Sequence, residues 1–236
     1  MNAFRPFNSS DWDKIGFVVF DVDGTLYQQR PVRIRILRDM LLHALLRRNL
    51  RDLVVITNYR RIRERLADER VEGFERLLIS ETASSTSSSA DDVRAIVKEW
   101  IEQRPVPYLR ACRYPGLKEL FAGLRRRGKS IGILSDYPAE DKLVALELTA
   151  DYIVSAADED VGCLKPHPRG LEVLIAKAGV KAHTTLMIGD RASRDGLVAQ
   201  GVGARALIRS SKSIEGWHTF ARFDDRLFAP VLAPSF

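Results

Sequence analysis

Several side chains that can do chemistry stand directly after short apolar segments of this chain of 236 residues. In an open α/β sheet the carboxyl ends of the parallel strands meet at one edge, and ligands bind there. Carboxylates gathered at such an edge can act as a nucleophile, as a general acid or base, or as ligands of a hard divalent cation. The candidates are Asp21, Asp23, Gly24 and Thr25 after the first segment, Ser135 and Asp136 after the second, Lys165 in a loop, and Asp190 and Asp195 after a later segment.

The elements that would position these residues follow an alternation of apolar runs and helical periodicity. Residues 15–21 form a nearly continuous apolar run, as expected of a parallel strand covered on both faces. From residue 117 onward, short apolar runs alternate with segments of helical periodicity. This rhythm predicts an open parallel sheet of the α/β class. Further strands are predicted at residues 130–135, 152–155, 184–189 and 204–209, and helices at residues 117–127, 139–148, 171–178 and near 197.

After the first strand, the sequence shows only helical periodicity as far as residue 110. Ile34, Leu37, Leu41 and Leu45 recur at helical spacing and predict a helix with an apolar stripe, which is widened by Met40, Leu42, Ala44 and Leu46. The all-helical stretch is therefore expected to be a separate domain inserted into the sheet. The expected units are an α/β core of residues 1–27 and 111–236 and an all-α insert of residues 28–110, with further helices at residues 52–70 and 90–103 and a flexible serine-rich linker at residues 84–89.

The order and spacing of the candidate residues resemble the four motifs of the haloacid dehalogenase superfamily of hydrolases. The resemblance covers residues 14–210 apart from the insert, and it implies a Rossmann-like parallel-sheet core. Many members of the superfamily carry a helical cap between the first and second motifs, which is where the insert stands here. The matching motifs are Asp21-x-Asp-Gly-Thr25, Ser135, Lys165-Pro and Gly189-Asp190-x-x-x-x-Asp195.

The resemblance implies a role for each carboxylate. Asp21 would attack phosphorus and form an aspartyl phosphate. Asp23 would protonate the departing alkoxide and then deprotonate the attacking water. Mg²⁺ would be held by Asp21, the backbone carbonyl of Asp23 and Asp190. Asp195 would either bind the ion directly or support the ligands from behind, and we favour the supporting role.

The remaining matched residues would bind the phosphoryl group. Ser135 would donate a hydrogen bond to a phosphoryl oxygen, and Lys165 would neutralise its charge. The turn at Gly24 and Thr25 would bring backbone N–H groups close to the phosphate. Asp136 follows Ser135 where asparagine is common in the superfamily, so it adds a negative charge near the mouth of the site unless a basic side chain pairs with it.

The acid at Asp23 argues against two other activities of the superfamily. Dehalogenases use one aspartate and no metal, and phosphonatases have a non-acidic residue there and a lysine in the cap, whereas the only lysine of this insert is Lys98. The sequence therefore predicts a Mg²⁺-dependent phosphatase acting on a small anionic phosphorylated metabolite. Two alternatives stay open. A phosphomutase shares all four motifs, and a non-catalytic scaffold could bind a partner through a basic cap.

The chain has 37 basic and 31 acidic residues, a formal charge of +6, and the excess is local. Residues 30–65 contain eleven arginines, no lysine and three acids. This basic segment fits either a solvated helix face or an attraction for anionic substrates. Nucleic acid is not expected as a partner, because no aromatic residues are interleaved with the basic ones.

The cysteine content and the lack of apolar runs bear on the compartment. Cys112 and Cys163 are the only cysteines, and they predict buried free thiols in a reducing environment. No apolar run approaches the ~18 residues of a membrane span. No secretory leader is recognised. We expect a cytoplasmic protein with no membrane association, and the sequence leaves its oligomeric state open.

Some further patterns are interpreted as structural. Thr57-Asn58 resembles a strand followed by a hydroxyl but is expected inside a helix. Gly201-x-Gly203-x-x-Ala206 precedes a strand instead of opening a helix, so it is not expected to bind a dinucleotide. His167 is expected to be a loop residue. Arg191 and Arg194 are expected either to form ion pairs with Asp190 or Asp195 or to be plain surface charges. The aromatic tail of residues 211–236 is expected either to pack on the core or to form an oligomer contact.

Overall fold

The computed structural model describes residues 7–233 and has a single parallel sheet of six strands. The strand order β3-β2-β1-β4-β5-β6 places β1 at the centre, between β2 and β4. This confirms the predicted Rossmann-like α/β class, and it adds a short edge strand, β6, that the sequence pattern did not reveal. The strands are β1 (Phe17–Phe20), β2 (Ser130–Ser135), β3 (Tyr152–Ser155), β4 (Thr185–Gly189), β5 (Arg205–Arg209) and β6 (Thr219–Phe220).

The residues of β1 point alternately to two separate apolar layers, which explains the continuous apolar run. Val18 and Phe20 belong to the larger layer, and Phe17 and Val19 to the smaller one. All four side chains are fully buried. Helices α6 (Leu117–Arg126), α7 (Glu140–Leu146) and α10 (Ala229–Leu232) pack in the larger layer, and α8 (Arg169–Ala178) and α9 (Leu197–Val202) pack in the smaller one.

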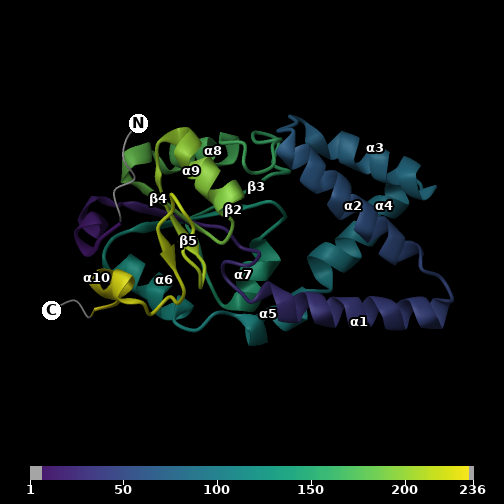
Figure 1. The fold of residues 1–236 in the computed structure, drawn as a ribbon, viewed down its shortest axis with the longest axis horizontal. Coiled ribbons are helices and arrows are strands. Elements are labelled where there is room, and N and C mark those ends of the chain that lie inside the picture. Colours follow the sequence, from purple (N-terminus) through teal and green to yellow (C-terminus); the bar gives the residue numbers. More distant parts are fainter. Residues whose placement is uncertain (1–6, 234–236) are drawn as a thin grey trace.

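All helices between β1 and α6 form an extension that lies to one side of the sheet (Figure 1). These helices do not cover the sheet. Their buried residues nevertheless extend the larger apolar layer into the insert. That residues 28–110 form a separate domain stays a prediction. In the structure, the last helix of the extension ends at Cys112. We refer to Gln29–Cys112 as the insert; it comprises α1 (Gln29–Arg47), α2 (Arg51–Asp68), α3 (Phe74–Thr86), α4 (Ala90–Val97), a π-helical continuation (Lys98–Gln103) and α5 (Val106–Cys112).

Only part of the apolar stripe predicted for the first insert helix packs: Met40 and Ala44 are buried, but the residues on which the stripe was centred are not. Val32, Ile36 and Met40 are buried, whereas Leu41 and Leu45 are 49% and 74% exposed. Both faces of α1 have helical spacing, so periodicity alone could not select the buried one. Ile34 and Leu37, the other residues of the predicted stripe, are also exposed.

Two further expectations for the insert need correction. The helix α3 was not predicted, and its last turn contains Ser84 and Ser85, which were expected in a flexible linker. Three side-chain-to-backbone hydrogen bonds in this turn, from Thr82, Ser85 and Thr86, satisfy carbonyl groups within the helix. Arg63 belongs to the basic segment, for which a solvated helix face was one of the two expectations, but it is buried.

The aromatic tail packs on the sheet, which confirms the first of the two predictions for it within the described residues. Phe220, Phe223 and Phe228 are buried in the larger layer, and Trp217 lies against Gly196. Cys112 and Cys163 are buried free thiols, as expected. Among residues 7–233, no helix has both the length and the apolar character needed to cross a membrane.

Candidate active site

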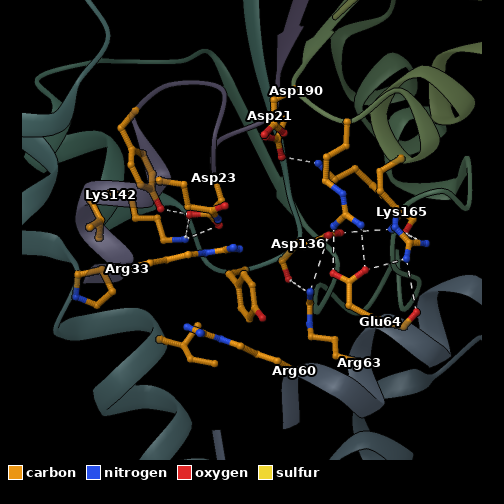
Figure 2. A pocket seen from close by; sticks show the side chains of 18 of the residues that line it. Asp21, Asp23, Arg33, Arg60, Arg63, Glu64, Asp136, Lys142, Lys165 and Asp190 are labelled. Carbon is orange, nitrogen blue, oxygen red and sulfur yellow. Dashed lines mark hydrogen bonds and ion pairs between the residues drawn. The ribbon is translucent and has the colours of Figure 1, made fainter. Parts of the chain in front are cut away.

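A cavity of about 370 Å³ lies between the carboxyl edge of the sheet and the insert. Its floor is formed by the turns after β1, β2 and β4, and its roof by residues of α1, α2 and the π-helical segment (Figure 2). The chain reverses its strand order between β1 and β4, and this reversal opens a crevice where ligands bind in such sheets. Of the residues predicted to act, Asp21, Asp23, Asp136, Lys165, Asp190 and Asp195 line the cavity.

Asp21 and Lys165 form a buried ion pair in the cavity. Lys165 Nζ donates a hydrogen bond to Asp21 Oδ1 and another, of 2.7 Å, to Asp195 Oδ1. Thr25 Oγ1 donates to the second oxygen of Asp21 at 2.8 Å, so this hydroxyl orients the carboxylate. Burial raises the pKa of Asp21 well above its ordinary value against the opposing charge of Lys165, and the charges of Asp195 and Asp190 raise it further.

Asp21, Asp190 and Asp195 bring one carboxylate oxygen each to within 4.8 Å of one another. Two glycines make this approach possible, because a Cβ on Gly24 would lie 2.2 Å from Asp190 Oδ2 and one on Gly189 would lie 2.2 Å from Asp195 Cγ. Burial and the charge of Asp195 raise the pKa of Asp190 to about 6. Three oxygen ligands with one lysine as the nearby cation fit a hard divalent ion.

Asp23 lies apart from this cluster, on the other side of the cavity (Figure 2). Its two oxygens accept hydrogen bonds of 2.8 and 2.7 Å from Lys142 Nζ, and Oδ1 also accepts one from the Tyr27 hydroxyl. Although burial opposes it, the charge of Lys142 and these hydrogen bonds lower the pKa of Asp23. The Asp23 side chain is therefore held as a carboxylate, the form that accepts a proton.

The remaining predicted residues support the cavity instead of lining it. Ser135 is buried, and its hydroxyl accepts a hydrogen bond of 3.2 Å from the Tyr137 amide. Gly24 has a φ of 103°, and its carbonyl accepts a hydrogen bond from Arg209. In this arrangement, Gly24, Thr25 and Ser135 are not among the residues that line the cavity.

Asp136 pairs with a basic side chain, Arg63, which offsets its negative charge near the mouth of the site. Arg63 Nη1 lies 3.8 Å from Asp136 Oδ2, and Arg63 also donates to the Asp136 carbonyl. The guanidinium of Arg63 packs over the Tyr137 ring, 4.0 Å from its centre. Arg63 comes from the insert and Asp136 from the loop after β2, so the contact joins the two parts of the chain.

A second ionic contact joins α2 to the loop after β4. Glu64 accepts hydrogen bonds of 2.9 Å from Arg191 and from Arg194, and Arg194 also donates to Asp68 at 2.6 Å. The side chains of both arginines therefore pair with the insert, which corrects the expected ion pairs with Asp190 or Asp195. Plain surface charge is also wrong for Arg194, which is buried. We call Glu64, Asp68, Arg191 and Arg194 the clamp.

The other patterns interpreted as structural lie where they were expected. Thr57 and Asn58 lie within α2, and Gly203 ends α9 just before β5. His167 is a loop residue 3.8 Å from Glu72 and does not line the cavity.

Sequence reasoning missed several cavity residues because they belong to segments that were interpreted only as helices. Lys142 lies in the helix predicted at residues 139–148, and Tyr27 follows the first motif directly. Arg33 and Arg60 were noticed only as part of the basic segment. A weak signal existed for Lys142, since a lysine buried in an amphipathic helix must find an anion, but its partner could not be identified without the fold.

The chain is similar to known hydrolases of one family. Residues 15–203 match the model of the haloacid dehalogenase-like hydrolases. A curated relative, the phosphoglycolate phosphatase of Yersinia pestis, is 31% identical over 93 residues. The match covers 38% of this chain and 40% of the relative, so the chain spans about two-fifths of the length of that protein.

Solved structures share the fold at low sequence identity. A HAD-hydrolase of Bacillus subtilis, YfnB, bound to magnesium, is 15% identical with a TM-score of 0.65, and the match covers 97% of this chain and 99% of that one. A 2-haloacid dehalogenase of Pseudomonas syringae is 20% identical with a TM-score of 0.59, over 85% of this chain and 90% of that one.

Proposed function

Because this chain belongs to the haloacid dehalogenase-like hydrolases, we propose that it is a Mg²⁺-dependent phosphatase that hydrolyses a small phosphate monoester through an aspartyl-phosphate intermediate. The observation that carries the proposal is the placement of two aspartates with different surroundings in one cavity. Asp21 lies beside Lys165, Asp190 and Asp195, and Asp23 lies across from them beside Lys142. Two carboxylates in distinct environments suit two distinct roles.

In the first step, an oxygen of Asp21 forms a bond to phosphorus while the bond from phosphorus to the alcohol oxygen breaks. The hydrogen bond from Thr25 and the ion pair with Lys165 hold the attacking carboxylate in one direction. Lys165 also places a positive charge where the phosphoryl oxygens would gather negative charge. The alcohol leaves on the side of Asp23.

Asp23 supplies and removes the proton that each step requires. The incoming phosphate dianion raises the pKa of Asp23 by like-charge repulsion, and this favours a protonated carboxyl that can give its proton to the leaving alkoxide. In the second step the Asp23 carboxylate takes a proton from the water that attacks the phosphoaspartate. The contacts with Lys142 and Tyr27 suit this second role, because they stabilise the ionised form.

Asp21 and Asp190 are the side chains that would hold Mg²⁺, with Asp195 beside them and the backbone carbonyl of Asp23 as a further predicted ligand. When bound, the ion would offset the repulsion between the carboxylates and the phosphoryl oxygens. The contact of Asp195 with Lys165 fits the supporting role that we favour for it.

We further propose that the insert acts as a cap that excludes bulk water from the cavity during the reaction. The clamp and the contact between Arg63 and Asp136 support this proposal, because they connect the insert to the two loops that carry Asp136 and Asp190.

Phosphate release from an aryl phosphate, with and without Mg²⁺, tests the proposal. We expect turnover that stops when divalent cations are chelated and returns with Mg²⁺. Asp21→Asn should lower kcat by about three powers of ten or more while the protein stays folded. Near wild-type release of phosphate by folded Asp21→Asn would contradict the role of Asp21, and activity that resists chelation would contradict the metal. Transfer of phosphate within a sugar phosphate, without release, would indicate a mutase instead.

A further inference from the structure

Two arginines line the cavity without an acidic partner among the described residues. The other basic side chains of the cavity are all paired: Arg63 with Asp136, Lys142 with Asp23, Lys165 with Asp21 and Asp195, and Arg191 and Arg194 with the clamp acids. Arg33 and Arg60 line the same cavity. Within residues 7–233, neither forms an ion pair or a side-chain hydrogen bond.

The two unpaired guanidinium groups come from different helices and point toward the same part of the cavity. Arg33 is on α1 and Arg60 on α2, and both extend toward the side that holds Asp23 and Lys142 (Figure 2). Partial loss of hydration in the cavity lowers the pKa of Arg60, and the nearby charge of Arg33 lowers it as well. Both residues are exposed to solvent, and like charges that face one part of a cavity attract an anion.

This part of the cavity lies on the side from which the alcohol would leave. Asp23 is the residue proposed to protonate the leaving oxygen, so whatever lies beyond Asp23 contacts the alcohol portion of the substrate and not its reacting phosphate. The walls of the cavity also include Val32, Ile36 and Ile101, which are apolar and buried. They suit a short carbon chain.

We propose that the alcohol portion of the substrate carries a second anionic group, a carboxylate or a second phosphoryl group, bound between Arg33 and Arg60. This inference rests on the proposed phosphatase function and names the substrate class for it. The planar guanidinium group can donate two parallel hydrogen bonds to either anion. The cavity volume of about 370 Å³ limits the substrate to a small metabolite.

The residue next to Arg60 offers a matched control. Arg61 has the same charge and lies on the same helix, but it does not line this cavity. Its guanidinium contacts Asn58 at 3.0 Å on the exposed surface. Arg61→Gln therefore removes one positive charge from α2 without touching the proposed anion site.

The test compares three esters that share a three-carbon chain. Propyl phosphate has no second charge, 2-carboxyethyl phosphate adds a carboxylate, and propane-1,3-diol bisphosphate adds a phosphoryl group. For the wild-type protein with Mg²⁺, we expect kcat/KM to be at least about tenfold higher for one of the charged esters than for propyl phosphate, as charge-assisted hydrogen bonds allow. The ester that is preferred identifies the anion.

Substitution should remove this preference. In Arg33→Gln and in Arg60→Gln we expect the ratio of kcat/KM values for the charged and uncharged esters to fall about tenfold. Arg60→Lys should retain part of the ratio, and Arg61→Gln should keep it at the wild-type value. A wild-type ratio near one, or a ratio that survives both glutamine substitutions, would overturn the inference.

A binding measurement separates this inference from the proposed function. Calorimetry with 4-phosphonobutanoate and butylphosphonate, which cannot be hydrolysed, needs no turnover. The carboxylate should tighten binding to the wild-type protein about tenfold, and Arg60→Gln should abolish that advantage. If none of the esters is hydrolysed, the phosphatase proposal fails. Equal affinities of the wild-type protein for the two phosphonates would instead overturn the second-anion site.

Discussion

Gly24 shows how closely the residues of the site are packed. Its φ of 103° is rarely adopted by other residues, and a Cβ there would lie 2.2 Å from an oxygen of Asp190. Gly24→Ala should therefore displace Asp190 and weaken Mg²⁺ binding, and the backbone strain alone should lower the free energy of unfolding by about 1–3 kcal/mol.

Gly16→Ala is the matched control for this substitution. Gly16 lies just before β1, the strand that Gly24 follows, and no atom lies within 4 Å of the position of its added Cβ. We expect less than about 1 kcal/mol of change in stability and no change in Mg²⁺ binding. Thermal unfolding and Mg²⁺ titration calorimetry would measure both effects, and equal behaviour of the two variants would argue against the close approach at Gly24.

Lys142 sets the charge state of Asp23, and its removal should change the dependence of activity on pH. The pKa of Asp23 is lowered by Lys142, so Lys142→Met should raise it. The acidic limb of the kcat profile should then move to higher pH where attack of water on the phosphoaspartate limits the rate, because Asp23 acts as a base in that step. Lys142→Arg keeps a positive charge and should leave the limb near its original pH.

The same substitution removes one partner of a buried ion pair. Lys142 is buried, so Lys142→Met should also lower the free energy of unfolding, by about 3–5 kcal/mol. Thermal unfolding would reveal this loss, and the pH profile is to be measured below the unfolding temperature of the variant. An acidic limb that does not move in folded Lys142→Met would show that Asp23 does not set that limb.

The site residues that the sequence identified are those whose position follows from chain order. Asp21 and Asp190 directly follow strands, and neighbouring parallel strands bring such residues together whatever the rest of the chain does. Lys142, Arg33 and Arg60 face the cavity only because of the way their helices are rotated and docked. That rotation depends on packing against distant segments, which periodicity does not encode.

At the scale of an element, α1 shows why the buried face was not predictable. The helix carries apolar residues on both of its sides, so the pattern was compatible with either rotation. Contacts with α2 and α5 and the buried position of Ile36 beside the cavity select one of them. Short strands were predicted more accurately, because a run such as residues 17–20 is buried on both faces and needs no choice of rotation.

This rotation of α1 can be tested with two adjacent residues. Met40 is 5% exposed and Leu41 is 49% exposed. Met40→Ala should lower the free energy of unfolding by about 2–5 kcal/mol because it leaves a cavity in the core. Leu41→Ala should change it by no more than about 0.5 kcal/mol. Denaturant unfolding would measure both, and a larger loss for Leu41→Ala would favour the rotation expected from the sequence.

At the scale of the whole molecule, the basic segment of residues 30–65 is not a single surface. Arg63 is buried against Tyr137, and Arg65 pairs with Glu69 and Glu81 within the insert. Arg60 faces the cavity while its neighbour Arg61 does not. The local excess of arginine therefore serves several separate contacts, and a general attraction for anions is not needed to explain it.

The clamp connects the insert to the core and should influence how far the cavity stays closed. The hydrogen bonds from Arg191 and Arg194 lower the pKa of Glu64 to about 2, against an ordinary value of 4.5. Since the pKa is lowered in the folded protein, these contacts contribute fully above about pH 4.5, and the contribution is lost as the pH falls toward 2. The Glu64 side chain is 52% exposed, so solvent screening limits its contribution to about 1 kcal/mol or less.

Glu64→Gln should therefore open the insert more often without unfolding either part. At pH 7 we expect faster amide hydrogen exchange in α2, a KM raised about twofold to fivefold, and a smaller difference from wild type at high salt because exposed charges are screened. As the pH falls from about 4.5 toward 2 the difference in exchange should shrink, because Glu64 takes up a proton first in the open form and then in the closed form. Glu69→Gln is the control, because Glu69 pairs at 2.8 Å with Arg65 inside the insert and does not reach the core. If the two variants exchange at the same rate at pH 7, Glu64 does not hold the insert against the sheet, and other contacts between the two parts, such as those of Arg194 with Asp68 and of Arg63 with Asp136, do so instead.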